Sequence, residues 1–169
     1  MYYVNNILNY YHINPRKGKE WYVSEREFCQ NLARETGYTF VQVAGIVAAG
    51  SINTKWARNK EFASAYCRGE NPRHLKMVLN KCERIKTSSA YEIPDILNGA
   101  KVKCFYANLT GCDNAVTIDR WAYRAATGKD TKRVPAKEYP LIAQAYTLAA
   151  NIAGIAPAVM QSIVWENIR

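Results

Sequence analysis

The sequence predicts an all-α fold, a single compact helical domain over residues 1–169. Apolar side chains recur at the three- and four-residue spacing of amphipathic helices. Residues that start and stop helices, such as Thr39 and Gly128, bracket these stretches. The alternating pattern of a strand is confined to Ala115–Ile118, which is too short for a sheet.

The bulk composition is that of a globular protein, with 49% hydrophobic and 22% charged residues. The longest apolar stretch, Leu141–Ile155, contains polar residues and falls short of the roughly 20 residues of a membrane helix. No basic segment precedes an apolar run at the N-terminus, as a signal peptide would require. We therefore expect a soluble, cytoplasmic protein that does not contact a membrane.

The formal net charge is +9, which favours polyanionic partners. Residues 55–86 hold nine lysines and arginines against three glutamates. Five cysteines at irregular spacing, without a CxxC pair, argue against disulfides, zinc and iron–sulfur clusters. They are Cys29, Cys67, Cys82, Cys104 and Cys112.

The first two expected helices each begin at a capping box, in which a hydroxyl and a longer side chain satisfy the first-turn amides. Ser24 and Glu27 form one such pair, and this helix closes at Gly37. Thr39 and Gln42 form the next, and the helix ends near Gly50.

A third helix is expected after the N-cap Asn53, ending at Arg68 before Gly69. Asn71–Pro72 opens a fourth, because proline suits the first helical position. Its apolar stripe consists of Leu75, Val78, Leu79, Cys82 and Ile85.

The second half of the chain continues as helices separated by glycine and proline. A short helix ends at Leu97, and a tight turn at Asn98 and Gly99 leads into a helix from Ala100 to Leu109. Three further helices are expected over 119–127, over 135–153, and from Pro157 onward. No linker or repeat divides the chain, which favours one domain.

Two segments carry the residues best suited to chemistry, 96–106 and 115–121. A glycine turn before a helix exposes backbone amides that bind phosphate, and lysines add positive charge there. The apolar run 115–118 delivers Asp119 to a helix start. A fixed carboxylate stabilises a cationic sugar and can activate an attacking water.

These segments resemble the helix-hairpin-helix DNA glycosylase superfamily, the endonuclease III-like fold, with the hairpin at about residues 90–110. Leu97–Lys101 stands at the family's hairpin, and Thr117-Ile118-Asp119 stands at its carboxylate motif. The resemblance implies an N-glycosylase that flips a damaged or modified base out of double-stranded DNA and excises it, with Asp119 as the catalytic carboxylate. It also implies that Asn98, Gly99 and Ala100 bind the DNA backbone.

The chain departs from the family pattern at several positions. The second hairpin glycine is missing, Arg120-Trp121 replaces the residues that usually follow the aspartate, and the C-terminal cysteine cluster is absent. No metal or organic cofactor is therefore expected, although the resemblance allows a monovalent ion at the hairpin. The small size favours a phage or antiphage-defence enzyme acting on a bulky modified cytosine, such as glucosylated hydroxymethylcytosine.

The catalytic lysine of the resemblance has two candidates. Aligning on the hairpin leucine selects Lys103, whereas aligning back from Asp119 selects Lys101. The two lie roughly 200° apart around a helix, so only one can face a given pocket. We favour Lys101, and either one would permit a Schiff base with strand nicking (AP-lyase activity).

A base pocket is expected where a polar turn meets the third helix, because a flipped base needs an aromatic face and amide partners. Asn53, Trp56 and Asn59 have these properties and would share one side of the helix, with Tyr22 and Trp165 as weaker candidates. Lys55, Arg58 and Arg120 are expected to contact the DNA backbone.

Plainer interpretations remain open at this stage. Asp119 could serve only as an N-cap, Trp56 as a core residue, and each lysine as a solvated surface group. The whole protein could be a noncatalytic helix-hairpin-helix module that binds DNA, or a helical domain that binds another protein. We expect a monomer in each case.

Overall fold

The computed structural model describes residues 1–169, which form ten α-helices and no strand, so the expected all-α class is confirmed. The helices are α1 (Tyr2–Ile13), α2 (Trp21–Thr36), α3 (Phe40–Gly50), α4 (Trp56–Cys67), α5 (Lys76–Ile85), α6 (Ile93–Ile96), α7 (Ala100–Leu109), α8 (Arg120–Thr127), α9 (Tyr139–Ala153) and α10 (Pro157–Ile168).

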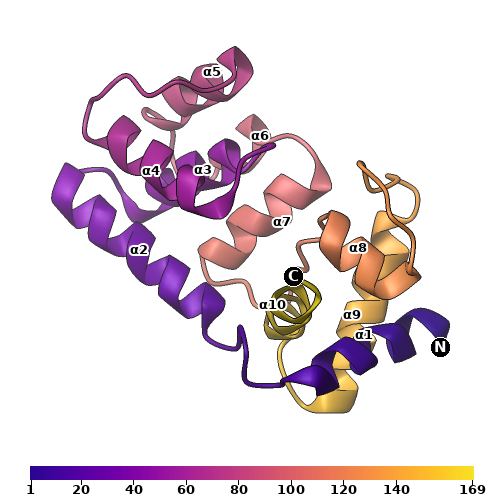
Figure 1. Cartoon of the computed structure of the whole chain (residues 1–169). Coiled ribbons are helices and arrows are strands. Elements are labelled where there is room, and N and C mark those ends of the chain that lie inside the picture. Colours follow the sequence, from indigo (N-terminus) through magenta and orange to yellow (C-terminus); the bar gives the residue numbers. More distant parts are fainter. The chain divides into compact units, whose positions relative to one another are not determined.

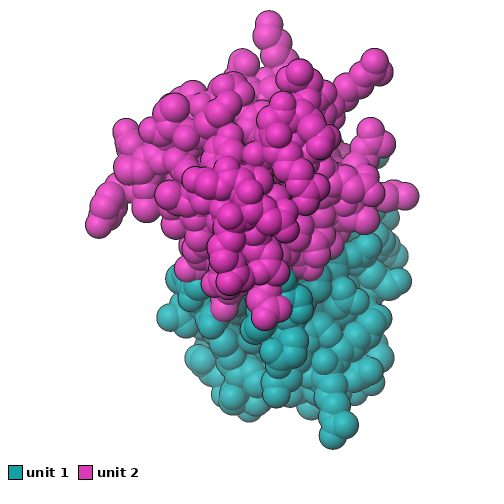
Figure 2. Space-filling view, turned by 90° about the vertical axis from the view of Figure 1, so that its left-hand side faces the viewer, with its two compact units in different colours: residues 1–24, 111–169 teal, residues 25–110 magenta.

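The helices form two compact units, coloured separately in Figure 2. Unit 1 combines both ends of the chain, Met1–Ser24 and Gly111–Arg169, and unit 2 is Glu25–Thr110. The first boundary falls inside α2 and the second directly after α7. Neither place carries the composition of a linker, which is why the sequence patterns indicated no division.

Unit 1 is a helical bundle in which α1 packs against α8, α9 and α10, and α10 also packs against α8 and α9 (Figure 1). Large side chains such as Ile7, Ile142, Tyr146 and Met160 are fully buried in its core. Alanines of α8 and α9 are also buried in this core, and their small side chains let neighbouring helix backbones come close.

Unit 2 is organised around α3, whose residues Val43–Gly50 are all buried. Helices α4, α5 and α7 pack against it (Figure 1). A helix that is apolar on all sides is stable only when neighbours cover every face. Close packing on α3 uses glycine: a Cβ at Gly45 would lie 2.9 Å from Ile93 Cγ2.

Several expected helix ends are confirmed by their capping contacts. Gln42 N donates to Thr39 Oγ1 at 3.3 Å, and Thr39 N donates to Gln42 Oε1 at 3.0 Å, which completes the capping box of α3. Gly128 and Gly154 end α8 and α9 in the left-handed conformation. The expected Ala100–Leu109 helix has the bounds of α7, and Pro157 begins α10.

Other expected starts are wrong, and each correction has a local cause. Helix α2 begins at Trp21, where Trp21 N donates to Gly18 O, so Ser24 lies inside the helix and caps nothing. Helix α4 begins at Trp56 and not after Asn53, because Asn53 adopts the left-handed conformation with φ 53°.

The expected starts of α5 and α9 at Pro72 and Pro135 are also too early. Helix α5 begins at Lys76, after an irregular approach, and α9 begins at Tyr139. Pro135 O accepts from the amides of Glu138 and Tyr139, so the proline opens a turn before the helix.

Helix α1 was not expected, and it forms a large part of unit 1. The extended stretch 115–118 has no partner strand. One side chain satisfies two of its backbone groups, since Tyr139 Oη donates to Val116 O at 2.9 Å and accepts from Ile118 N at 3.0 Å. No single helix has the length and apolar character of a membrane span; α9 and α10 reach it only together, across a 99° bend.

Candidate functional site

The segment expected to form the hairpin consists of α6, a turn and α7, all in unit 2. Leu97 is fully buried and anchors the turn, whereas Asn98, Gly99 and Ala100 are exposed. Gly99 has φ 83°, a conformation that favours glycine. Nothing lies within 4 Å of where its Cβ would stand, so the backbone is accessible at this point.

The first turn of α7 presents backbone amides that have no acceptor within the helix. Lys103 N is the first to donate backward, to Gly99 O at 3.1 Å. The side chain of Lys103 is exposed and that of Lys101 is half-buried, with the buried Val102 between them. The two candidate lysines therefore have different surroundings, as expected from their rotation around the helix.

Asp119, in unit 1, is the N-cap of α8. Its Oδ1 accepts from Trp121 N at 2.9 Å and from Ala122 N at 2.8 Å, while its Oδ2 accepts from Trp165 Nε1 at 2.9 Å. Three N–H donors thus fix the orientation of one half-buried carboxylate. The indole contact comes from α10, so it joins residues that lie 46 positions apart in the sequence.

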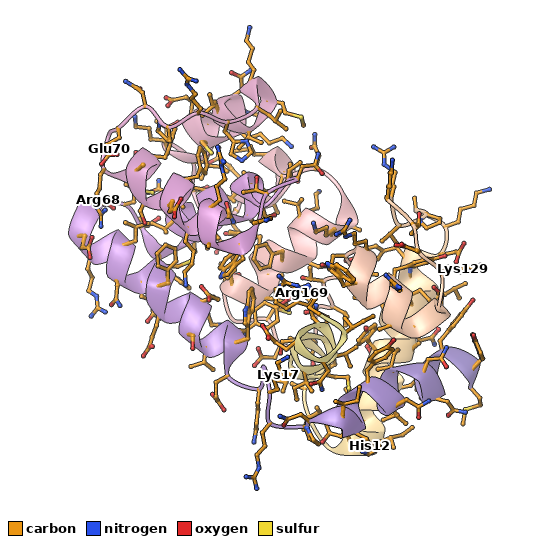
Figure 3. All side chains as sticks on the ribbon, in the orientation of Figure 1. His12, Lys17, Arg68, Glu70, Lys129 and Arg169 are labelled. Carbon is orange, nitrogen blue, oxygen red and sulfur yellow. The ribbon has the colours of Figure 1, made fainter.

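Trp165, which contacts this carboxylate, and Trp121, which follows it by two residues, each pack against an arginine. The Trp165 ring lies 5.7 Å from that of Trp21, and Arg169 stacks on it at 3.9 Å. Arg169 is labelled at the end of the chain in Figure 3. Arg120 lies 4.7 Å from the Trp121 ring centroid. Of these residues, the sequence had indicated only Arg120 and Trp165 as site candidates. The contact between Trp21 and Trp165 depends on tertiary packing, whereas Arg120 and Arg169 each stack on a ring within four residues of themselves.

A buried tyrosine holds the first turn of α8, which Asp119 caps. Tyr146 on α9 donates to Ala122 O at 3.0 Å, and its side chain is fully buried. Burial raises the pKa of Tyr146 well above its ordinary value, and the negative charge of Asp119 raises it further. The hydroxyl therefore stays protonated and holds the first turn of α8 in place.

The four residues expected to form a base pocket are not assembled within one unit. Tyr22 belongs to unit 1, where it is buried and donates to Gln161 Oε1 at 2.8 Å. Asn53, Trp56 and Asn59 belong to unit 2. Asn53 lies outside α4, so the expectation that all three share one side of that helix is wrong.

The two α4 residues have different environments. Asn59 is fully buried, and its Nδ2 donates to Val47 O at 2.9 Å, so its amide acts between α3 and α4. Trp56 is half-buried, with its ring 5.7 Å from that of Phe105. Of the expected pocket residues in unit 2, only Asn53 is exposed and Trp56 partly so.

Three cations of the basic segment 55–86 form ion pairs within the protein or are buried. Lys60 pairs with the buried Glu25 at 2.8 Å, Arg68 pairs with Glu35 at 3.0 Å, and Lys81 is buried. Arg68 and the neighbouring Glu70 are labelled at the end of α4 in Figure 3. The remaining cations are exposed and available to an anionic partner: Lys55, Arg58, Arg73, Lys76, Arg84 and Lys86.

The cysteines form no disulfide. Burial raises the pKa of the Cys29, Cys67 and Cys82 thiols to about 12, so these groups remain neutral within the core. No group of three or more histidine, cysteine, aspartate or glutamate side chains is arranged to hold a metal ion.

Fold and site together define an all-helical protein with an exposed hairpin in one unit and a capped carboxylate among tryptophans and arginines in the other. Residues 2–169 match the model of DUF7178, a family of unknown function, and the chain belongs to that family. No curated protein and no solved structure matches it significantly.

Proposed function

We propose that this protein is a DNA N-glycosylase with Asp119 as its catalytic carboxylate. The observation that carries the proposal is the carboxylate itself, which is oriented by three N–H donors, one of them the indole of Trp165. Such a preoriented anion stabilises developing positive charge without reorganising during the reaction.

The chemistry requires one bond to break and one to form. As the bond between C1′ and the base nitrogen lengthens, positive charge develops on the deoxyribose, and the Asp119 carboxylate stabilises it. A water attacks C1′ and loses a proton, for which the carboxylate is the acceptor or the orienting group. The departing base takes up a proton, which leaves free base and an abasic site.

The hairpin in unit 2 supplies the expected grip on the DNA backbone. A helix N-terminus attracts a phosphate through its free amides and its dipole. In α7 these amides follow the exposed Gly99, and the side chain of Lys103 is accessible one turn later. The exposed Lys55 and Arg58 add positive charge in the same unit.

One observation favours a second candidate function, a noncatalytic DNA-binding module. Both oxygens of Asp119 already accept hydrogen bonds within unit 1, which is what a purely structural N-cap would do. A module of this kind would bind DNA with a steep salt dependence and release no base.

The deciding experiment incubates the full chain with three DNAs and measures free base and abasic sites. The DNAs are unmodified, oxidised, and substituted with glucosylated hydroxymethylcytosine. We expect release from a modified DNA and none from the unmodified control, with the bulky modified cytosine as the favoured substrate. Binding without release from any of the three would replace the glycosylase by the noncatalytic module.

A separate prediction concerns the lysine. If Lys101 acts as an amine nucleophile, borohydride reduction during the reaction should trap a covalent protein–DNA adduct. We expect Lys101→Ala to abolish the adduct and Lys103→Ala to retain it. Absence of an adduct in the wild type, with base release intact, would show a monofunctional enzyme whose lysines only contact phosphate.

A further inference from the structure

A groove in unit 1 lies apart from the residues assigned so far. It has a volume of about 430 Å³ and is formed by α1 and the C-terminal end of α8. This volume is in the range of small-molecule sites, roughly 300–1,000 Å³. Its lining consists of Tyr2, Asn6, Asn9, Tyr10, Ile13, Arg124, Ala125 and Gly128.

The α1 side of the groove combines ring faces with amide groups. Tyr2 is 65% exposed, so a large aromatic side chain stands in solvent at the rim. Asn6 Nδ2 donates to Ala126 O at 2.8 Å, which joins α1 to α8 and leaves the amide oxygen available to a ligand. Asn9 is exposed and can offer both donor and acceptor. Aromatic faces beside amide groups suit a planar heterocycle with a hydrogen-bonding edge.

The α8 side of the groove contributes Arg124, whose contacts with other side chains are weak. Arg124 makes a long ion pair of 3.8 Å with Asp130, and both side chains are substantially exposed, at 45% and 77%. Its guanidinium also lies 5.9 Å from the centroid of the Trp121 ring. Exposed pairs of this kind contribute little and are easily exchanged. The planar guanidinium can instead bind a phosphate through two parallel hydrogen bonds.

The loop that follows α8 extends this positive charge. Lys129, Lys132, Arg133 and Lys137 are all exposed, whereas Glu138 accepts a hydrogen bond from Tyr123 Oη at 2.7 Å. Lys129 is labelled beside the end of α8 in Figure 3. Between Arg120 and Lys137 there are six cationic side chains and one aspartate. The groove therefore opens beside a strongly positive segment that the basic run 55–86 does not include.

We propose that this groove binds a nucleotide, with the base against the Tyr2 ring and the amides of α1, and the phosphate on Arg124. A bare anion lacks the planar group that the tyrosines and amides fit, and an apolar ligand leaves Arg124 unused. The site does not depend on base excision at Asp119, so either assignment can fail without the other.

The test titrates the full chain with deoxyadenosine monophosphate and follows amide chemical shifts by NMR. We expect shifts in α1, at the end of α8 and in the following loop. Inorganic phosphate, as the comparison probe, should not reproduce the α1 shifts. Shifts that are the same for both probes, or that avoid α1, would overturn the proposal.

Two variants with matched controls locate the site. Tyr2→Ala and Arg124→Gln should each weaken nucleotide binding by about tenfold or more, as expected for loss of a stacked ring or a phosphate contact. Tyr91→Ala and Arg16→Gln remove an exposed tyrosine and an exposed arginine that do not line the groove, and these variants should bind like the wild type. Unchanged binding in both groove variants would disprove the site.

The bound nucleotide could be free or part of a single DNA strand. Comparing the affinities of the mononucleotide and a short oligodeoxyadenylate distinguishes these two sources. Tighter binding of the oligonucleotide, lost in Lys132→Gln and Arg133→Gln, would identify a single strand that continues along the basic loop. Equal affinity per site would identify a free nucleotide. Neither titration measures released base, which separates this result from the test of base excision.

Discussion

Replacing Asp119 by asparagine is expected to lower base release by about a hundred- to a thousandfold, the usual cost of losing one preorganised electrostatic contact. Asparagine is nearly the same size and is itself a favoured N-cap, so its Oδ1 can still accept from Trp121 N and Ala122 N. Only the negative charge and the bond from Trp165 Nε1 to Oδ2 are lost. The measurement is the rate of abasic-site formation on the DNA from which the wild type releases base fastest.

Three further variants separate the effect of the Asp119 charge on base release from its role as the N-cap of α8. Asp119→Ser keeps an oxygen for the cap but no carboxylate, and it should be as inactive as the asparagine variant. Trp165→Phe retains a ring and removes the indole donor, so a smaller rate loss is expected. Asp119→Ala removes the cap as well and should lower the free energy of unfolding by about 1 kcal/mol. Thermal unfolding of each variant serves as the structural control.

A different pattern would assign Asp119 to structure alone. If asparagine and serine variants release base at the wild-type rate while the alanine variant is less stable, the carboxylate is an N-cap without catalytic function. The noncatalytic module would then be the better description of the protein, and the salt dependence of DNA binding should be the same in wild type and variants.

The sequence predicted those features of the fold that depend on short-range chemistry. Gly99, Asp119 and Gly128 stand at helix ends because the left-handed conformation and the capping hydrogen bond are decided within a few residues. For the same reason, local sequence patterns suffice to locate the helix starts after Gly99 and after Asp119.

Features that depend on distant residues could not be predicted in this way. The bond from Trp165 to Asp119 exists only because α10 packs beside α8. The early start of α2 follows from the burial of Tyr22 against Gln161, which outweighs the local capping signal at Ser24. The division into two units left no trace in composition, because one boundary lies inside a helix.

Gly50→Ala is expected to destabilise the protein by about 1–3 kcal/mol, the usual cost of overpacking a core. The sign of this change in stability is informative, because a glycine-to-alanine substitution at an uncrowded helical position stabilises a protein by up to about 1 kcal/mol. At Gly50, an added Cβ would overlap Asn59 Oδ1 and lie 2.8 Å from Phe62 Cδ1. Ala57→Gly, at an exposed position in α4, calibrates the helix-propensity contribution.

The overlap between a Cβ at position 50 and Asn59 Oδ1 can be tested by a double-mutant cycle at these two positions. Asn59 Oδ1 is buried without a hydrogen-bond partner, so the side chain is held there by its Nδ2 bond to Val47 O and by the close approach of Gly50. Asn59→Ala should itself destabilise by about 1 kcal/mol through loss of that bond. Because the smaller side chain leaves room for a Cβ at position 50, the double variant should be more stable than the sum of the single changes by about 1 kcal/mol. Urea unfolding of the four proteins measures this coupling, and strictly additive changes would mean that Phe62, and not the buried amide, fixes the distance between α3 and α4.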